Sequence, residues 1–464
     1  MIANGMPATA GLEPAFRLAL RFAVMAGLAV AILVALLLVR GVVLDRQQHR
    51  NDAVAAIAAS HAGAQQFAGP VLVVPYEETE RIATTDADGR EQVVERKRSG
   101  RWTFFPETLA VDGKLLPATR RLGLHEVRVY EFQAGVTATF DARVPEATPG
   151  STRTIGDAWL AYSIADVRGL AGAPRLRVDG ADVALGQGMG ATSDGGIHAR
   201  LAAPRAGDVL SLDTRLDIAL AGTESLAIAP VGGRNDIAIA SAWPHPRFEG
   251  AFLPRTRAVG ADGFRAGWHV SSLASNAQGQ FLAAAAAGAG DARGRGVPGV
   301  ESVAVSLVDP VNPYTLADRA TKYGILFVLL TFGGFFLFET VKRLPIHPIQ
   351  YLLVGLALSI FFLLLLALSE RIAFGWAYIA ASVACVGLLG FYLAHVLRSR
   401  MRGLAAGGAF ALLYAALYGL LVSEDNALVL GAGLLFVVLA GAMVATRKVD
   451  WYAVGQASRT RTTA

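Results

Sequence analysis

The sequence predicts an α+β polytopic membrane protein, in which a β-rich, sandwich-like domain is inserted between the first and second of six transmembrane helices. Three observations support this prediction. The 464 residues are 53% hydrophobic and only 17% charged, whereas soluble domains have roughly 25% charged residues. Six stretches are apolar over about the length that crosses a bilayer. Between the first two lie about 275 residues whose apolar positions alternate, as they do in strands.

The six apolar stretches lie near residues 22–43, 323–339, 349–369, 373–396, 404–422 and 427–446. A helix needs roughly 20 apolar residues to cross the hydrocarbon at about 1.5 Å per residue. The first stretch is predicted to be an uncleaved signal anchor, because its apolar run from Phe22 to Val39 is longer than the core of a secretory signal. Gly324, Gly333 and Gly334 are predicted to allow close helix packing.

Basic residues at the ends of these stretches predict the orientation, because Lys and Arg resist translocation. One side has all four basic clusters: Arg17 with Arg21, Lys342 with Arg343, Arg398 with Arg400 and Arg402, and Arg447 with Lys448. The sequence therefore predicts four segments: a cytoplasmic N-terminus with the anchor helix over 1–44, an extracytoplasmic β-rich domain over 45–320, a five-helix bundle over 321–448 and a cytoplasmic tail over 449–464.

The excess positive charge follows from this topology rather than from a nucleic-acid surface. Residues 45–320 contain 28 Lys and Arg against 31 Asp and Glu, whereas the rest of the chain contains 14 against 6. The net charge of +5 therefore comes from the membrane half. A nucleic-acid interface would need basic residues gathered on one soluble face, and the sequence predicts none.

The extracytoplasmic part is predicted to be a sandwich or folded-over sheet of half-buried strands. Its apolar residues alternate with polar ones in runs at 210–220, 264–270 and 303–307. The pairs Asp112-Gly113 and Asp179-Gly180 are predicted to form hairpin turns, because Asp-Gly readily adopts the positive φ that a tight turn needs.

Two segments depart from this pattern. Residues 45–60 combine Ala with charged residues and should continue the first membrane helix outward for a few turns. Residues 278–299 are rich in Ala and Gly and are predicted to form a loose loop, because such a segment buries little specific surface.

The sequence predicts a protein that is not an enzyme, with no catalytic residue, metal or cofactor. No zinc-protease H-E-x-x-H, phosphate-binding loop or G-x-S-x-G motif occurs in a plausible setting. The histidines have no metal-ligand spacing. The single cysteine, Cys385, excludes an intramolecular disulfide framework and a cysteine-based zinc site.

The most distinctive local sequence is an aromatic loop with Trp243, His245, Phe248 and Phe252. Prolines on both sides of His245 fix an extended backbone, and the aromatic rings offer a surface for a partner or ligand. The alternative is a rigid loop whose rings close one end of a β core, because aromatic residues usually serve burial.

Charged residues lie at the ends of the apolar stretches rather than in their middles, which argues against ion-coupled transport. Asp318, Arg319 and Lys322 lie where the chain re-enters the membrane, and Glu339 lies at the next cytoplasmic turn. These four residues are candidates for a mechanical joint between domain and bundle. The alternatives are interfacial anchoring and helix capping.

Several local stretches, in the same order and from about residue 20 to 452, resemble the CreD family of inner-membrane proteins, also called cell envelope integrity proteins. The stretches that carry the resemblance are Gly69–Pro75, Arg96–Ser99, Phe105–Leu109, Val111–Gly113, Trp243–Pro246, Phe252–Pro254, Asp318–Tyr323, Phe335–Glu339, His347–Gly355 and Leu364–Glu370.

The resemblance implies a bacterial inner-membrane protein with a periplasmic domain, produced under a Cre two-component system. It also implies effects on envelope integrity, colicin tolerance and the response to β-lactams, and it implies no reaction, cofactor or catalytic residue. We therefore expect a non-enzymatic envelope-stress protein whose partners are the lipid bilayer and an envelope protein, lipid or peptidoglycan. The alternatives are a carrier or modifying enzyme for an amphiphilic or glycan envelope component, and a protein that modulates a sensor kinase.

Overall fold

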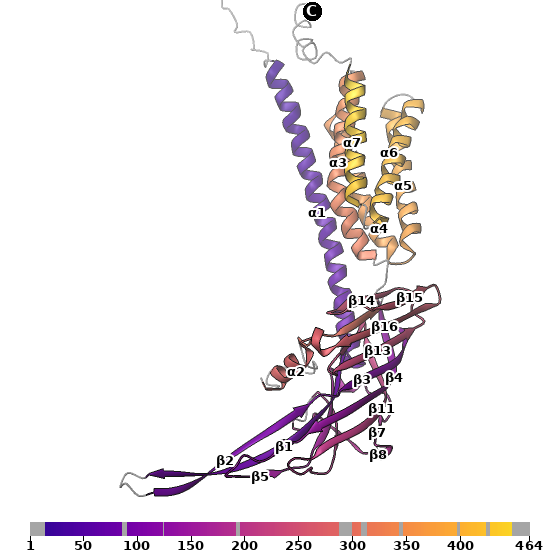
Figure 1. Ribbon diagram of the computed structural model, residues 1–464. Helices are drawn as coiled ribbons and strands as arrows, with labels where there is room; N and C mark the ends of the chain where they lie inside the picture. The colour runs from indigo at the N-terminus through magenta and orange to yellow at the C-terminus, as the bar shows by residue number, and fades with distance from the viewer. Residues whose placement is uncertain are drawn as a thin grey trace, which may run out of the picture. The chain divides into compact units, whose positions relative to one another are not determined.

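The computed structural model describes residues 14–85, 91–123, 125–191, 195–286, 299–307, 313–342, 347–396, 400–423 and 427–447. It divides into two compact units, a helical unit (Met1–His49 with Val311–Ala464) and a β unit (Arg50–Pro310). Figure 1 labels the elements of both. The predicted mixture of apolar helices with a large β-rich domain is confirmed.

The helical unit contains a helix over each of the six predicted apolar stretches: α1 (Pro14–Ser60), α3 (Pro313–Lys342), α4 (Pro348–Ser369), α5 (Phe374–Val396), α6 (Arg400–Val422) and α7 (Ala427–Thr446). Within the described residues, segments of α1, α4, α5 and α6 are long and apolar enough to cross a membrane. The start of α4 is fixed by a capping box, in which His347 and Gln350 satisfy backbone N–H groups of the first turn.

Close packing of α1 on α4 depends on a glycine. A Cβ atom at Gly355 would lie 1.6 Å from Cδ1 of Ile32, which is fully buried. The prediction for Gly324 is confirmed, because a Cβ there would lie 2.9 Å from the Phe362 ring. Gly333 and Gly334 have open space where a Cβ would stand, so their predicted role in packing is wrong.

The first sheet of the β unit is centred on β1 (Gln65–Thr85), and Figure 1 shows β1, β2 and β5 running together as an extended arm. The strand order is β14-β17-β12-β1-β6-β10-β9, with β2 and β5 also paired to β1. The other strands of this sheet are β2 (Glu91–Phe104), β5 (Ser151–Ile155), β6 (Trp159–Ile164), β9 (Leu185–Gln187), β10 (Gly196–Arg200), β12 (Ser225–Ala229), β14 (Pro246–Gly250) and β17 (Val303–Leu307).

The second sheet has the strand order β15-β16-β13-β3-β4-β11-β7-β8. Its strands are β3 (Thr108–Leu122), β4 (His125–Arg143), β7 (Arg175–Val178), β8 (Ala181–Val183), β11 (Val209–Thr223), β13 (Arg234–Ser241), β15 (Thr256–Gly260) and β16 (Gly263–Ser271). The described part of the unit also contains two 3-10 turns, Val167–Gly169 and Ser272–Ala274, and the helix α2 (Ala277–Ala286).

The two sheets share a single hydrophobic core. On β16 the predicted alternation is confirmed, with Phe264, Ala266, Trp268 and Val270 buried between exposed or half-buried neighbours. On β17 it is wrong, because all five residues from Val303 to Leu307 are buried. Because successive side chains of a strand point to opposite faces, the burial of all five residues means that both faces of β17 are covered.

One of the two predicted hairpin turns is confirmed. Asp179 and Gly180 join β7 to β8 with φ angles of 50° and 82°. Asp112 and Gly113 instead lie inside β3, paired to β4 on one side and β13 on the other. Pairing on both sides overrides the turn preference of Asp-Gly at this position.

The two segments that depart from the strand pattern also have different outcomes. Residues 45–60 continue the first helix to Ser60, as predicted. The predicted loose loop at 278–299 is wrong over its first part, where α2 extends to Ala286 and buries Phe281. The Phe281 ring packs edge-on against Phe105 with centroids 6.0 Å apart. Residues 287–298 lie outside the described part.

Candidate functional site

The aromatic loop is held to the β unit through Trp243. Its indole N–H donates to the backbone carbonyl of His245 at 2.9 Å. The Arg128 guanidinium lies 4.8 Å from the centre of the Trp243 ring, which is a cation–π contact. Trp243 is half-buried, and His245 is exposed.

The other two rings of the loop pack on the core. Phe248 meets Phe264 and Trp268 edge-on, with centroids 5.7 and 5.8 Å apart. The carbonyl of Phe252 accepts a hydrogen bond from the Trp268 indole at 3.1 Å. Trp243, Phe248 and Phe252 are therefore all half-buried against the core, and His245 is exposed.

The candidate joint contains a three-residue charge cluster inside the helical unit. Asp318 on α3 accepts a hydrogen bond from Arg40 Nε of α1 at 3.0 Å and faces Lys322 Nζ at 2.6 Å. The Asp318 side chain is only 17% exposed. Its carboxylate therefore neutralises two cations, whose own side chains are 39% and 55% exposed.

Two further residues on the Arg40 face of α1, Val43 and Arg46, also attach this helix to the helical unit. Val43 is fully buried and packs with Tyr314, Ala317 and Leu366. Arg46 Nε then lies 3.7 Å from Glu370 Oε1, an oxygen that also accepts from the Tyr314 hydroxyl at 3.5 Å. Arg40, Val43 and Arg46 are three residues apart, which places them on one helix face. We call this face the α1 clamp.

The four predicted joint residues do not gather at one place. Arg319 is half-buried and next to Asp318 in sequence. Glu339 lies 21 residues farther along α3, which at about 1.5 Å per residue is roughly 32 Å away along the helix axis. Its side chain lies outside the described part of the chain. Neither Arg40, the α1 partner of Asp318, nor Arg46, the partner of Glu370, had a distinctive sequence signal, because both belong to the charged residues that follow an apolar stretch.

The end of α1 is held in the β unit by a second set of contacts. Arg168 Nη1 donates to the carbonyl of Ala59 at 2.6 Å, which satisfies an acceptor of the last helical turn. Arg168 also forms a bidentate ion pair with Asp166. The hydrogen bonds from Arg168 help to keep the Asp166 pKa below its usual value. Ile57 packs on Val127 and Val129.

A buried ion pair lies at the base of the arm formed by β1, β2 and β5. Arg153 Nη2 donates to Glu78 Oε1 at 2.8 Å, and both side chains are nine-tenths buried. The Arg153 guanidinium also lies 5.3 and 5.1 Å from the centres of the Tyr76 and Trp102 rings. Hydrogen bonds from Ser151 and then Arg153 lower the Glu78 pKa from 4.5 to about 2.

This lowered pKa predicts how stability depends on pH. Ionised Glu78 should stabilise the β unit fully above pH 4.5, and the contribution should disappear as the pH falls from there toward 2. The variant Glu78→Gln should therefore be less stable than the parent at neutral pH, and the difference should shrink in acid. Urea unfolding of the purified full-length protein at several pH values measures this.

A matched control for this prediction is Glu77→Gln, because Glu77 is the exposed neighbour on the same strand. It should leave the pH dependence unchanged. A Glu78→Gln protein whose deficit is equally large at pH 2.5 and pH 7 would contradict the role of the ionised carboxylate.

The described residues contain no candidate metal site. Within that part of the chain, no group of three or more His, Cys, Asp and Glu side chains could hold a metal ion. The predicted absence of a catalytic site and of a cofactor remains a prediction.

Comparison with known proteins shows what this chain is similar to. The model of the family described as "Inner membrane protein CreD" matches residues 17–452. The inner membrane protein CreD of Escherichia coli (strain K12) is 36% identical over 430 residues, which cover 92% of each chain. Among solved structures, an M1 zinc metallopeptidase from Deinococcus radiodurans is 11% identical, with a TM-score of 0.22 over 44% of this chain and 42% of that one. A similarity that low does not indicate a shared fold.

Proposed function

Because this chain belongs to the CreD family of inner membrane proteins, we propose that it crosses the bacterial inner membrane six times, with both termini in the cytoplasm and residues 50–310 in the periplasm. The basic clusters on one side of the apolar stretches support this orientation. Four helical segments have the length and composition of membrane spans, and α3 and α7 would supply the other two.

The proposed function is to maintain or sense the integrity of the cell envelope without catalysis. One observation carries it: α1 is attached by specific contacts in each unit. In the helical unit, Arg40 and Arg46 of the α1 clamp pair with Asp318 and Glu370, and in the β unit Arg168 donates to the carbonyl of Ala59. A helix held at both places would pass a displacement of the periplasmic unit to the membrane helices.

This proposal extends to the cellular roles that the family resemblance implies. We place the protein in a Cre-type two-component response, with effects on colicin tolerance and on the response to β-lactams. The partner of the periplasmic unit would be an envelope protein, a lipid or peptidoglycan. A sensor kinase would contact the cytoplasmic loops.

The packing of the β unit favours this function over a carrier. A carrier for an amphiphilic molecule would need an apolar cavity, because such sites bury most of their ligand. The space between the two sheets is instead filled by one continuous core. Phe248 and Phe252 pack on that core rather than lining an entrance.

The test is to make α1 flexible between its two attachments. Insertion of Gly-Gly-Ser-Gly between Gln47 and Gln48 breaks the helix but leaves the contacts of Arg40, Arg46 and Ala59 in place. In a strain that lacks the gene, the insertion variant should fail to restore the barrier against a hydrophobic dye. Limited proteolysis should show that both units remain folded.

The control is an insertion of seven alanines at the same position. Seven residues form close to two helical turns, so the two parts of the helix keep nearly the same rotational orientation, and most of the activity should return. Full restoration of the barrier by the glycine insertion would overturn the relay through α1.

A further inference from the structure

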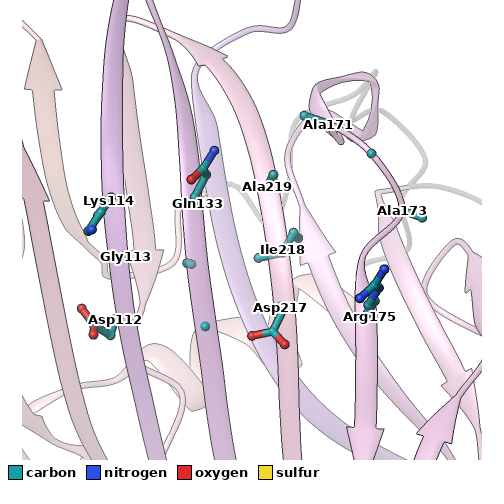
Figure 2. Close-up of a pocket in the computed structure, with 13 residues that line it drawn as sticks. Asp112, Gly113, Lys114, Gln133, Ala171, Ala173, Arg175, Asp217, Ile218 and Ala219 are labelled. Carbon is teal, nitrogen blue, oxygen red and sulfur yellow. The ribbon is translucent and has the colours of Figure 1, made fainter.

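An open cavity of about 490 Å³ lies on the outer face of the second sheet, over β3, β4 and β11. The strand register arranges its polar residues in two rows. Asp112, Gly135, Asp217 and Arg175 lie directly opposite one another on four adjacent strands. Lys114, Gln133 and Ala219 form the next row on the same face. Figure 2 shows these side chains around the cavity.

Gly135 forms the floor between the two aspartates, and the fold does not require a glycine there. A Cβ at this position would meet only Asp217 Oδ1, at an ordinary contact distance of 3.6 Å. Glycine inside a strand is destabilising by roughly 0.5–1 kcal/mol relative to Ala. A glycine that weakens a strand without a packing reason is typical of a place where another molecule approaches the backbone.

Some of the charged side chains around Gly135 have no partner of opposite charge within the described part of the protein. In the described part of the chain, Asp112 and Lys114 have no side-chain partner, and both are exposed. Asp217 is half-buried and lies 3.4 Å from Arg215 and 3.7 Å from Arg177. The Gln133 amide donates one N–H to Glu131 at 2.7 Å, so its second N–H is available to a ligand.

We propose that this cavity, which we call the Gly135 slot, binds a short zwitterionic peptide. The peptide ammonium would lie over Gly135 between the Asp112 and Asp217 carboxylates, which belong to strands about 10 Å apart. The peptide carboxylate would meet Lys114 and Gln133 in the next row, and Ala219 leaves room there for a side chain.

The spacing of the rows sets the length of the ligand. Residues two apart on a strand are separated by about 6.8 Å, and an extended dipeptide spans about 7 Å. A dipeptide therefore places its two charges at the two rows. A zwitterionic lipid headgroup has the same charges on a shorter linker, so it fits the slot less well.

Binding of the dipeptide Lys-Ala to the full-length protein in phosphatidylcholine nanodiscs tests the proposal, with ligand-observed NMR as the measurement. Lys-Ala should bind, and versions with an acetylated α-amine or an amidated carboxyl should bind at least about tenfold more weakly. Asp112→Asn should weaken binding by about tenfold, because it removes a charge-assisted hydrogen bond.

Gly135→Val gives the sharpest test, because it fills the slot with a residue that favours strands. It should abolish binding and leave the unfolding midpoint equal to or above that of the parent. Thr137→Val is the matched control: Thr137 is exposed on the same strand two residues away and outside the cavity. It should bind Lys-Ala normally.

Absence of Lys-Ala binding to the parent protein would overturn the proposal, and so would either of two further results. One is unchanged binding of Lys-Ala to Gly135→Val, which would place the peptide elsewhere. The other is a slot that binds glycerophosphoethanolamine more tightly than Lys-Ala, which would identify a lipid headgroup as the ligand.

Discussion

Replacement of Trp268 by Ala should lower the free energy of unfolding of the β unit by about 3–5 kcal/mol, the range for removal of a large buried ring. Trp268 is fully buried on β16. Its indole ring packs edge-on against the Phe248 ring, and its indole N–H donates to the carbonyl of Phe252. The variant therefore leaves a cavity and also an unpaired carbonyl.

Urea unfolding of the purified full-length protein, followed by the circular dichroism of its strands, measures the effect. The variant Trp268→Phe should lose less, about 1–2 kcal/mol, because it keeps a ring and removes only the hydrogen bond and part of the volume. Leu273→Ala is the control, since this side chain is 97% exposed. An unfolding midpoint for Trp268→Ala equal to that of the parent would show that Trp268 does not hold the core together.

Replacement of Asp318 by Ala should destabilise the attachment of α1 in the helical unit by about 2 kcal/mol. Removal of one partner from a buried pair costs roughly 3–5 kcal/mol, and the partial exposure of Asp318 and Arg40 reduces this value. The variant leaves Arg40 and Lys322 close together without a counter-charge. Asp318→Asn should lie between parent and Ala, because the amide keeps a hydrogen bond but loses the charge.

Thermal unfolding in detergent and crosslinking of α1 to α3 measure this second effect. Asp45→Ala is the matched control, because the Asp45–His49 pair on α1 is exposed on both sides and exposed pairs contribute little. A loss of stability in Asp45→Ala as large as that in Asp318→Ala would indicate a general charge effect rather than the α1 clamp.

The helices were predictable from the sequence because their signal is local. An apolar stretch of transmembrane length needs no knowledge of its neighbours, and each predicted stretch lies on a helix. The same holds for the turn at Asp179-Gly180. Prediction failed where residues far away in the sequence determine the local structure. Asp112-Gly113 lies inside β3 because β13, more than 120 residues later, pairs with that strand.

The candidate sites show the same limit. The sequence identified Asp318 and Lys322 but could not identify Arg40, because a spacing of 278 residues has no local pattern. It emphasised Trp243, Phe248 and Phe252, and the structure packs all three against the core, which agrees with the alternative prediction that these rings serve burial. It gave no weight to Gly135, since a single glycine in an alternating run looks like any other until the rows of paired strands are known.

The long central strand β1 also constrains the order in which the β unit can assemble. Gln65–Ala68 at its start pair in parallel with Leu226–Ala229 of β12, which the ribosome makes about 160 residues later. Such pairing has a high contact order and is slow to form. The start of the first strand to be synthesised therefore keeps one edge unpaired until a much later strand is made, and unpaired edges favour aggregation. A factor that protects nascent chains should increase the yield of this protein more than that of a helical membrane protein of equal length.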